Sequence, residues 1–257
     1  MTYGYVGECV PGTNLHFQRN TSALPMDKLQ SFWPFREMGD GTSAIDLLGN
    51  SPLVAQNTMK WEPSNPCGGA LGSTDFAGTN NYWHTTGDAT ELSALNRQKK
   101  FWISVWFYPR SGAHGVISAR STGSNLGWYI FAATADGNPE RVGWGTASDA
   151  TTWSANIDTA AWSADAWNHV VCGTDQTTGS GTAFISLNGA TAVTGTRTIN
   201  APTSAADITF GNWNNSTNPL DGMIADCAYF VDVSANPTAA QIADLYNGGK
   251  GNTLVSG

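Results

Sequence analysis

Charged residues are scarce in this chain. Only 12% of its 257 residues are Asp, Glu, Lys or Arg, about half of the usual share in globular proteins. The net charge is −8. Nucleic-acid binding needs clustered Lys and Arg, so we expect no nucleic-acid partner. The polar surface must instead come from Thr, Ser, Asn and Gly, and such a neutral surface suits sugars or neighbouring proteins better than phosphates.

A long apolar run, a leader-like start and a metal-binding cysteine spacing are also lacking. Without a run of about 18 apolar residues, we expect no membrane span. Residues 1–30 lack a basic start followed by an apolar run, so we expect no signal peptide. The four cysteines form no Cys-x-x-Cys pair, which argues against zinc. Cys172 and Cys227 lie in apolar segments, either as core thiols or, if their strands are neighbours, as a disulfide.

Short apolar runs, separated by Gly, Asn, Pro and Ser, make up most of the chain. They are rich in β-branched and aromatic residues, as strands are. Asn188-Gly189 lies between two of them and predicts a hairpin, because both turn residues must accept a positive φ. About a dozen such strands with no helix between them favour a β-sandwich over βαβ units. The clearest runs span residues 101–108, 127–133, 169–174, 183–187 and 223–231.

One short helix is predicted near the C-terminus. Thr238 and Gln241 have the spacing of a capping box, in which two side chains satisfy the first free N–H groups of a helix. Gly248 and Gly249 can end the helix in the left-handed conformation. The apolar positions between them share one face and are Ile242, Leu245 and Tyr246.

The N-terminal residues differ from the rest. Residues 1–30 show no clean periodicity and run into Pro25. We interpret them as an N-terminal arm or docking segment, followed by one folded domain over residues 31–250 and a tail over residues 251–257.

Several motifs recur in an order that is typical of one family. They are WPF at 33–35, DFAGTNNYW at 75–83, FWISVWFYP at 101–109, AWNHVVCGTD at 166–175, LDGMIADCAYF at 220–230 and PTAAQIADLYN at 237–247. This series resembles laminin-G-like domains of the concanavalin A-like lectin/glucanase superfamily. The resemblance implies an all-β fold, namely a two-sheet antiparallel jelly-roll sandwich with one short C-terminal helix. It leaves function open, because this fold hosts lectins, hydrolases, adhesion modules and virion proteins.

Two features disfavour an enzyme. Trp167 and His169 are framework positions in the resembled family, and the sequence shows no nucleophile and carboxylate signature for a catalytic histidine. We therefore expect His169 to be packed and hydrogen-bonded. Glycoside hydrolases need two carboxylates, which sandwich glucanases carry as ExDxxE or ExDxE. Neither pattern occurs, nor does Asp-x-Asp, so we predict that the protein is not an enzyme.

The eleven tryptophans favour carbohydrate binding. An indole face fits the C–H groups of a sugar ring, and loops at the rim of a sandwich are where binding usually occurs. Trp213, flanked by Asn212 and Asn214, is the leading candidate, and Trp153 and Trp83 lie at other loops or strand ends. The alternative is that these rings only cap the ends of the sandwich.

Calcium is the one cofactor that the resemblance raises. A Ca²⁺ ion needs about six or more oxygen ligands. Both acidic positions of the family's FDGTNDY motif are replaced here, by Ala77 and Asn81. The candidate ligands for a calcium ion are Asp75, Asn80 and Asp226.

We predict a non-catalytic, lectin-like recognition or attachment module. Its partner would be a glycan or a neighbouring virion or cell-surface protein, and its location extracellular or on a virion surface. Jelly rolls with such Thr-, Ala-, Gly- and Asn-rich surfaces resemble bacteriophage decoration, fibre or tail components, which often form trimers. A homotrimer or another homo-oligomer is expected on this hypothesis. The alternatives are a purely structural capsid decoration or tail protein and a secreted carbohydrate-binding lectin.

Overall fold

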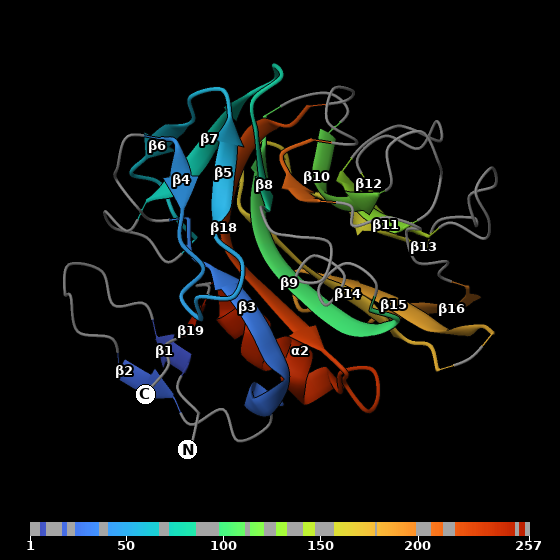
Figure 1. Ribbon diagram of the computed structural model, residues 1–257. Coiled ribbons are helices and arrows are strands. Elements are labelled where there is room, and N and C mark those ends of the chain that lie inside the picture. Colours follow the sequence, from blue (N-terminus) through green and yellow to red (C-terminus); the bar gives the residue numbers. More distant parts are fainter. Residues whose placement is uncertain are drawn as a thin grey trace.

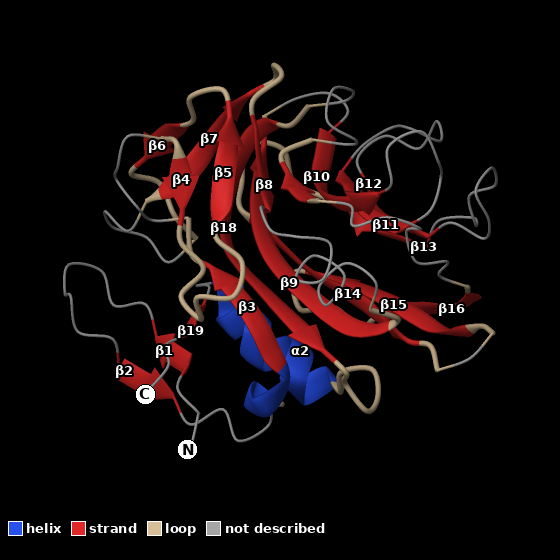
Figure 2. Ribbon diagram, in the orientation of Figure 1, coloured by secondary structure: helices blue, strands red, loops and turns tan. Residues whose placement is uncertain are grey.

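In the computed structural model, most of the described secondary structure is β-strand (Figure 2). The described residues are 6–8, 17–19, 24–35, 41–66, 72–85, 98–110, 114–120, 127–132, 141–146, 157–177, 179–198, 207–212, 219–249 and 252–254. Their strands form two eight-stranded antiparallel sheets and one small sheet.

Sheet I has the strand order β13-β12-β11-β10-β17-β8-β5-β4. Its strands are β4 (Ser43–Ala44), β5 (Leu53–Gln56), β8 (Tyr82–Thr85), β10 (His114–Arg120), β11 (Gly127–Ala132), β12 (Arg141–Thr146), β13 (Ile157–Ala161) and β17 (Ile208–Phe210).

Sheet II has the order β16-β15-β14-β9-β18-β7-β6, and β3 also pairs with β18. Its strands are β3 (Leu29–Trp33), β6 (Lys60–Glu62), β7 (Ser73–Ala77), β9 (Lys100–Pro109), β14 (Asn168–Asp175), β15 (Gly181–Leu187), β16 (Val193–Arg197) and β18 (Asp221–Val231). The long strand β9 lies at its centre, between β14 and β18 (Figure 1).

The main core lies between the two sheets. Side chains alternate along a strand, so every second residue of β9 points into this core. These residues are Phe101, Ile103, Val105 and Phe107. Trp83 and Trp128 enter from sheet I, and the ring centroids of Phe101 and Trp128 are 5.3 Å apart. This packing confirms the predicted all-β jelly-roll sandwich.

The opposite face of sheet II carries a second apolar cluster under helix α2 (Ala239–Tyr246). Trp102, Val171 and Phe230 of the sheet share this cluster with Leu245 of the helix. Both faces of sheet II are therefore apolar over this part, which explains why its strands read as nearly continuous hydrophobic runs.

The local sequence signals for turns and caps are confirmed. The Thr238 side chain accepts from the Gln241 N–H, and the Gln241 side chain accepts from the Thr238 N–H. Left-handed geometry at the helix end begins one residue before the predicted glycines, at Asn247 with φ 48°. Strands β15 and β16 form the predicted hairpin, with φ values of 52° at Asn188 and 72° at Gly189.

The two ends of the chain meet in a small third sheet. Strand β1 (Val6–Glu8) pairs with β2 (Phe17–Arg19) and with β19 (Asn252–Leu254), so that Val6 faces Leu254 (Figure 1). The chain joins the main domain before residue 31: Leu24 packs in the cluster under α2, the 3-10 turn η1 spans Met26–Lys28, and β3 pairs with β18. A second 3-10 turn, η2, covers Asn247–Gly249.

Cys172 and Cys227 are buried free thiols. They lie on β14 and β18, which β9 separates, so the core-thiol interpretation holds and the disulfide alternative does not. Cys9 and Cys67 lie outside the described residues. No helix in the described part of the chain has the length and apolar character needed to cross a membrane.

Candidate functional site

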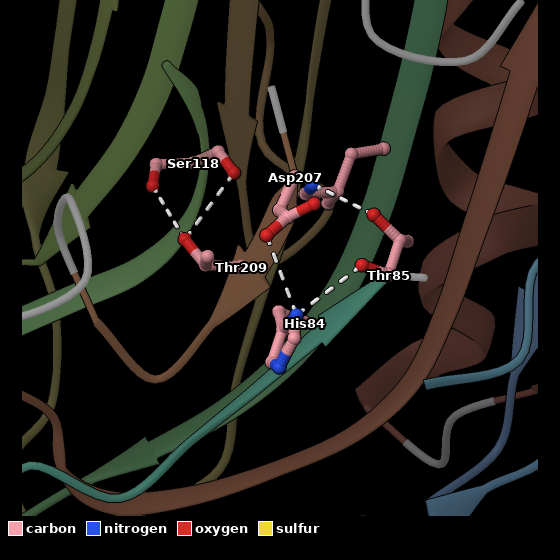
Figure 3. A network of polar contacts seen from close by, with 6 residues as sticks. His84, Thr85, Ser118, Asp207 and Thr209 are labelled. Carbon is pink, nitrogen blue, oxygen red and sulfur yellow. Dashed lines mark hydrogen bonds and ion pairs between the residues drawn. The ribbon is translucent and has the colours of Figure 1, made fainter. Parts of the chain in front are cut away.

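A strip of polar side chains crosses the outer face of sheet I. On β8, Trp83 points into the core, so Tyr82 and His84 point to the opposite face. Thr209 of β17 is the register partner of both His84 on β8 and Ser118 on β10. Figure 3 shows His84, Ser118 and Thr209 together with Asp207. We call Tyr82, His84, Ser118, Asp207 and Thr209 the polar strip.

His84 and Asp207 form the charged part of the strip. His84 Nδ1 lies 3.3 Å from Asp207 Oδ2, and the two side chains are 23% and 33% exposed. Hydrogen bonding to Asp207 raises the pKa of His84 and outweighs burial, which lowers it. The pair is partly open to solvent, so it offers both hydrogen-bond donor and acceptor groups to a ligand.

Tyr82 lies beside this pair. The centroids of the Tyr82 and His84 rings are 5.8 Å apart. Burial raises the pKa of Tyr82, and the negative charge of Asp207 raises it further. The phenol therefore stays protonated at neutral pH, which keeps its O–H group as a donor within the strip.

Two buried hydroxyl groups of the strip hold its strands together. Ser118 Oγ and Thr209 Oγ1 are 2.7 Å apart, and each lies 3.4 Å from the carbonyl oxygen of Asn212. Both side chains are only 2% exposed. They therefore hold β10, β17 and Asn212 in position and do not contact a ligand themselves.

Four asparagines extend the strip at one end of sheet I. Asn57 Nδ2 donates to the Asn80 carbonyl at 2.7 Å, Asn81 Nδ2 donates to the Thr58 carbonyl at 3.1 Å, and Asn212 Nδ2 donates to Asn80 Oδ1 at 3.4 Å. Asn57 and Asn80 are exposed, whereas Asn212 is fully buried. We call Asn57, Asn80, Asn81 and Asn212 the asparagine rim. Its exposed amides both donate and accept hydrogen bonds.

The predicted sugar-binding residues fall in different places. Asn212 joins the asparagine rim and positions Asn80. Trp83 is 0% exposed and packs in the core against Trp61, with ring centroids 5.8 Å apart. This corrects its expected surface position: Trp83 has the inward parity on β8, and its neighbours Tyr82 and His84 have the outward one. Trp153, Trp213 and Asn214 lie outside the described residues.

The three predicted calcium ligands lie in three different local environments. Asp75 is ion-paired with Arg110, and Asn80 accepts from Asn212. Asp226 is buried at a bulge of β18, with a φ of 46°. In the part of the chain that the structure describes, no three His, Cys, Asp or Glu side chains gather in a way that could hold a metal ion. The calcium hypothesis therefore gains no support from these residues.

His169 is a packed framework residue, as predicted. Its Nε2 lies 2.8 Å from Ser104 Oγ, and its ring lies 4.7 Å from that of Trp106 and 6.0 Å from that of Tyr246. Burial lowers the pKa of His169 to about 3. The imidazole is therefore neutral at physiological pH and is closed off by helix α2.

The polar strip was not foreseen from the sequence. Alternation along Tyr82-Trp83-His84 and along residues 207–210 would place these polar groups opposite the core. The pairing of β8 with β17 brings the two segments together, and this long-range pairing cannot be predicted from the sequence of either segment alone.

Two packed antiparallel sheets with a polar outer face define a lectin-type jelly roll. Residues 78–242 match the family model described as the concanavalin A-like lectin/glucanases superfamily. This match covers more than half of the chain, and the protein belongs to that superfamily. The resemblance seen in the sequence motifs is thereby confirmed. Comparison with curated proteins found no match.

Solved structures with the same fold include domain 4 of AbnA, an extracellular GH43 arabinanase from Geobacillus stearothermophilus, in complex with arabinotriose. It is 16% identical, with a TM-score of 0.58, and the match covers 84% of this chain and 97% of that domain. The binding domain of botulinum neurotoxin DC in complex with SialylT is 14% identical, with a TM-score of 0.59, 87% of this chain and 51% of that chain being covered.

A third similar structure is the sialidase of Trypanosoma rangeli. It is 11% identical, with a TM-score of 0.56, and the match covers 93% of this chain and 35% of that chain. This chain thus spans about half of the toxin domain and about a third of the sialidase. At these identities the likeness shows the shared fold alone.

Proposed function

We propose that this protein is a non-catalytic glycan-recognition module, in which His84 and Asp207 of the polar strip and the exposed asparagines of the asparagine rim contact the glycan. The observation that carries this proposal is the partly exposed His84–Asp207 pair on the outer face of sheet I, together with the exposed amides of Asn57 and Asn80 at the end of strands β5 and β8.

The chemistry of this surface supports a sugar ligand. A sugar hydroxyl both donates and accepts a hydrogen bond, and the surface offers both kinds of group without a large excess of charge. A phosphate or nucleic acid would call for clustered cations. Two structures of the same fold are described in complex with arabinotriose and with SialylT, which supports the same class of ligand here.

The number of carboxylates in the polar strip favours glycan binding over glycan hydrolysis. Glycoside hydrolases use two carboxyl groups, about 5 Å apart or up to roughly 9 Å apart, depending on mechanism. Among the described residues of the polar strip, Asp207 is the one carboxylate. The similar structures include glycosidase chains, so an assay for hydrolysis of the bound glycan belongs with the binding test.

A glycan array, followed by titration calorimetry with the best ligand, tests the proposal. Asn80→Ala removes the side-chain acceptor but keeps the Asn80 carbonyl that Asn57 uses. His84→Ala removes the imidazole of the charged pair. We expect each substitution to weaken binding about tenfold, the equivalent of about 1.4 kcal/mol, which a lost hydrogen bond with a partly buried ligand supplies.

Asn50→Ala is the matched control. Asn50 is an exposed asparagine whose side chain donates to one backbone carbonyl, that of Gln30, as Asn57 does at the rim. It precedes β5, whereas Asn57 follows β5, so the two lie at opposite ends of that strand. Wild-type affinity in Asn80→Ala and His84→Ala, or equal loss in Asn50→Ala, would contradict the proposed site.

We further propose that the module acts in attachment outside the cell or on a virion surface, the setting in which few charges and a Thr- and Asn-rich surface are common. The small sheet of β1, β2 and β19 is the candidate docking element. Deletion of residues 1–19 should abolish association with a particle or partner while sparing the fold. The deletion must stop before Leu24, which packs under helix α2. Unchanged association of the truncated protein would exclude docking through this sheet.

A further inference from the structure

The outer face of sheet II is divided into a covered part and an open part. Trp106 lies under helix α2, with its ring stacked 5.8 Å from that of Tyr246, and is 2% exposed. Two residues further along β9, Tyr108 is only half-buried. Helix α2 therefore covers one cross-strand row of this face and leaves Tyr108, in the next row, partly accessible.

Strand register shows which residues share the cross-strand row of Tyr108. Lys60 of β6 faces Asp75 of β7, Asp75 faces Met223 of β18, and Met223 faces Tyr108 of β9. Trp167, which directly precedes β14, continues the row beyond Tyr108. All five positions have the parity opposite to the core residues Phe107 and Ile224.

Tyr108 and Trp167 present two aromatic rings in a fixed relation. Their centroids are 5.7 Å apart, with an angle of 69° between the ring planes. The Trp167 indole N–H donates to Ser64 Oγ at 3.2 Å. Ser64 follows the edge strand β6, so a segment from that edge of sheet II holds this ring. Both rings are half-buried. They are oriented by the protein before any ligand arrives, which lowers the entropic cost of binding.

A charged group borders the rings on the same face. The Arg110 guanidinium contacts Asp75 directly and Asp221 at 3.3 Å, and its backbone N–H donates to the Asp221 carbonyl. Arg110 follows Tyr108 by two residues, and Asp75 is next to Met223 in the row. The rings are thus flanked by the partly exposed Asp221 carboxylate and Arg110 guanidinium, whereas the Asp75 side chain is mostly buried and anchors Arg110.

We propose that Tyr108, Trp167, Arg110 and Asp221 form a second carbohydrate-contact surface, which takes a single pyranose residue. The C–H face of the sugar packs on one of the two rings, whose faces are electron-rich, and the other ring borders the sugar. The Asp221 carboxylate accepts from its hydroxyl groups, and the Arg110 guanidinium donates to them. Acceptors and donors side by side match hydroxyls, whereas an ionic ligand would require one sign of charge.

This inference rests on the proposed function only for the class of ligand, since it uses the other sheet and no residue of the polar strip. The chain can be labelled with 5-fluorotryptophan and its ¹⁹F signals followed by NMR. Trp167→Phe assigns the Trp167 signal. The probes are the methyl glycosides of glucose, galactose and mannose, and N-acetyl-tyrosinamide stands in for a protein side chain.

We expect at least one methyl glycoside to shift the Trp167 signal in a saturable way. Tyr108→Leu should weaken this binding about tenfold, because it removes one of the two rings and keeps an apolar side chain. Tyr108→Phe should restore it. The proposal is overturned if no glycoside shifts the signal, if only N-acetyl-tyrosinamide does, or if Tyr108→Leu binds as well as the wild type.

The two sites can fail separately. If array glycans bind through the polar strip and the Trp167 signal does not respond, the second surface is refuted and the proposed function stands. If glycosides shift the Trp167 signal while Asn80→Ala and His84→Ala bind array glycans normally, the strip is refuted and the second surface stands. His84→Ala should leave the Trp167 response unchanged.

Discussion

Asn188 holds His169 through two hydrogen bonds. The Asn188 N–H donates to the His169 carbonyl at 2.8 Å, and the His169 N–H donates to Asn188 Oδ1 at 2.8 Å. The turn that connects β15 to β16 therefore also fixes the beginning of β14. This explains how His169 is kept in place between Trp106 and Tyr246, far from any surface on which it could react.

The buried state of His169 makes stability sensitive to acid. Its pKa is about 3 in the folded protein, compared with 6.5 for an unperturbed histidine. The unfolded chain thus binds a proton more readily than the folded protein does. The contribution of neutral His169 to the free energy of unfolding is therefore fully present above pH 6.5 and is lost as the pH falls towards 3. The expected loss is on the order of 5 kcal/mol. Urea unfolding of the wild type and of His169→Gln at several pH values measures it. A wild-type pH slope no steeper than that of the variant would contradict the prediction.

The His84–Asp207 pair has the opposite dependence on pH. Because the pKa of His84 is raised above 6.5 in the folded protein, its stabilising effect is complete below pH 6.5 and is lost as the pH rises through the folded-state value. The pair is partly exposed, so the effect should be below about 1 kcal/mol. NMR titration of His84 should show a lower pKa in Asp207→Asn than in the wild type. Identical titration curves would rule out the pairing.

The two core thiols should resist modification. Burial raises the pKa of both Cys172 and Cys227 well above the usual value, and nearby acidic groups add to this effect at Cys227. Since the thiolate is the reactive form, a variant with Cys9→Ser and Cys67→Ser should react with Ellman's reagent only after unfolding. Two thiols that react rapidly under native conditions would show that this core opens.

Gly211 should tolerate no side chain. Its φ is +79°, and an added Cβ would lie 2.1 Å from Phe76 Cδ1 and Cε1 in the core. We expect Gly211→Ala to cost about 3 kcal/mol, from steric overlap together with the left-handed backbone. Gly49→Ala is the control, because Gly49 has a φ of +76° and nothing within 4 Å of the added atom. Denaturant unfolding of both variants separates the two contributions, and equal losses would refute the steric one.

Much of the fold could be predicted because its signals are local. The runs at 101–108 and 223–231 became the two central strands β9 and β18. The capping box and the Asn-Gly turn depend only on neighbouring residues, and both appear where the sequence indicates them.

The candidate site was harder to predict because it depends on register between distant segments. Thr85 and Ile208 are 123 residues apart and still share a hydrogen bond. Trp83 shows the same difficulty: polar neighbours made it look like a loop residue, yet a shift of one position along β8 decides between core and solvent. Composition indicated a sugar-binding surface without indicating which face of which sheet would carry it.

The pairing of Val6 with Leu254 brings the beginning and the end of the chain to the same place. Any fusion partner, tag or surface tether attached at either terminus would therefore emerge beside the other. Joining the ends by a short linker and opening the chain at an exposed turn, such as that at Gly179, should give a circular permutant with the same sandwich. For immobilisation, one anchoring point would therefore serve for both ends of the chain.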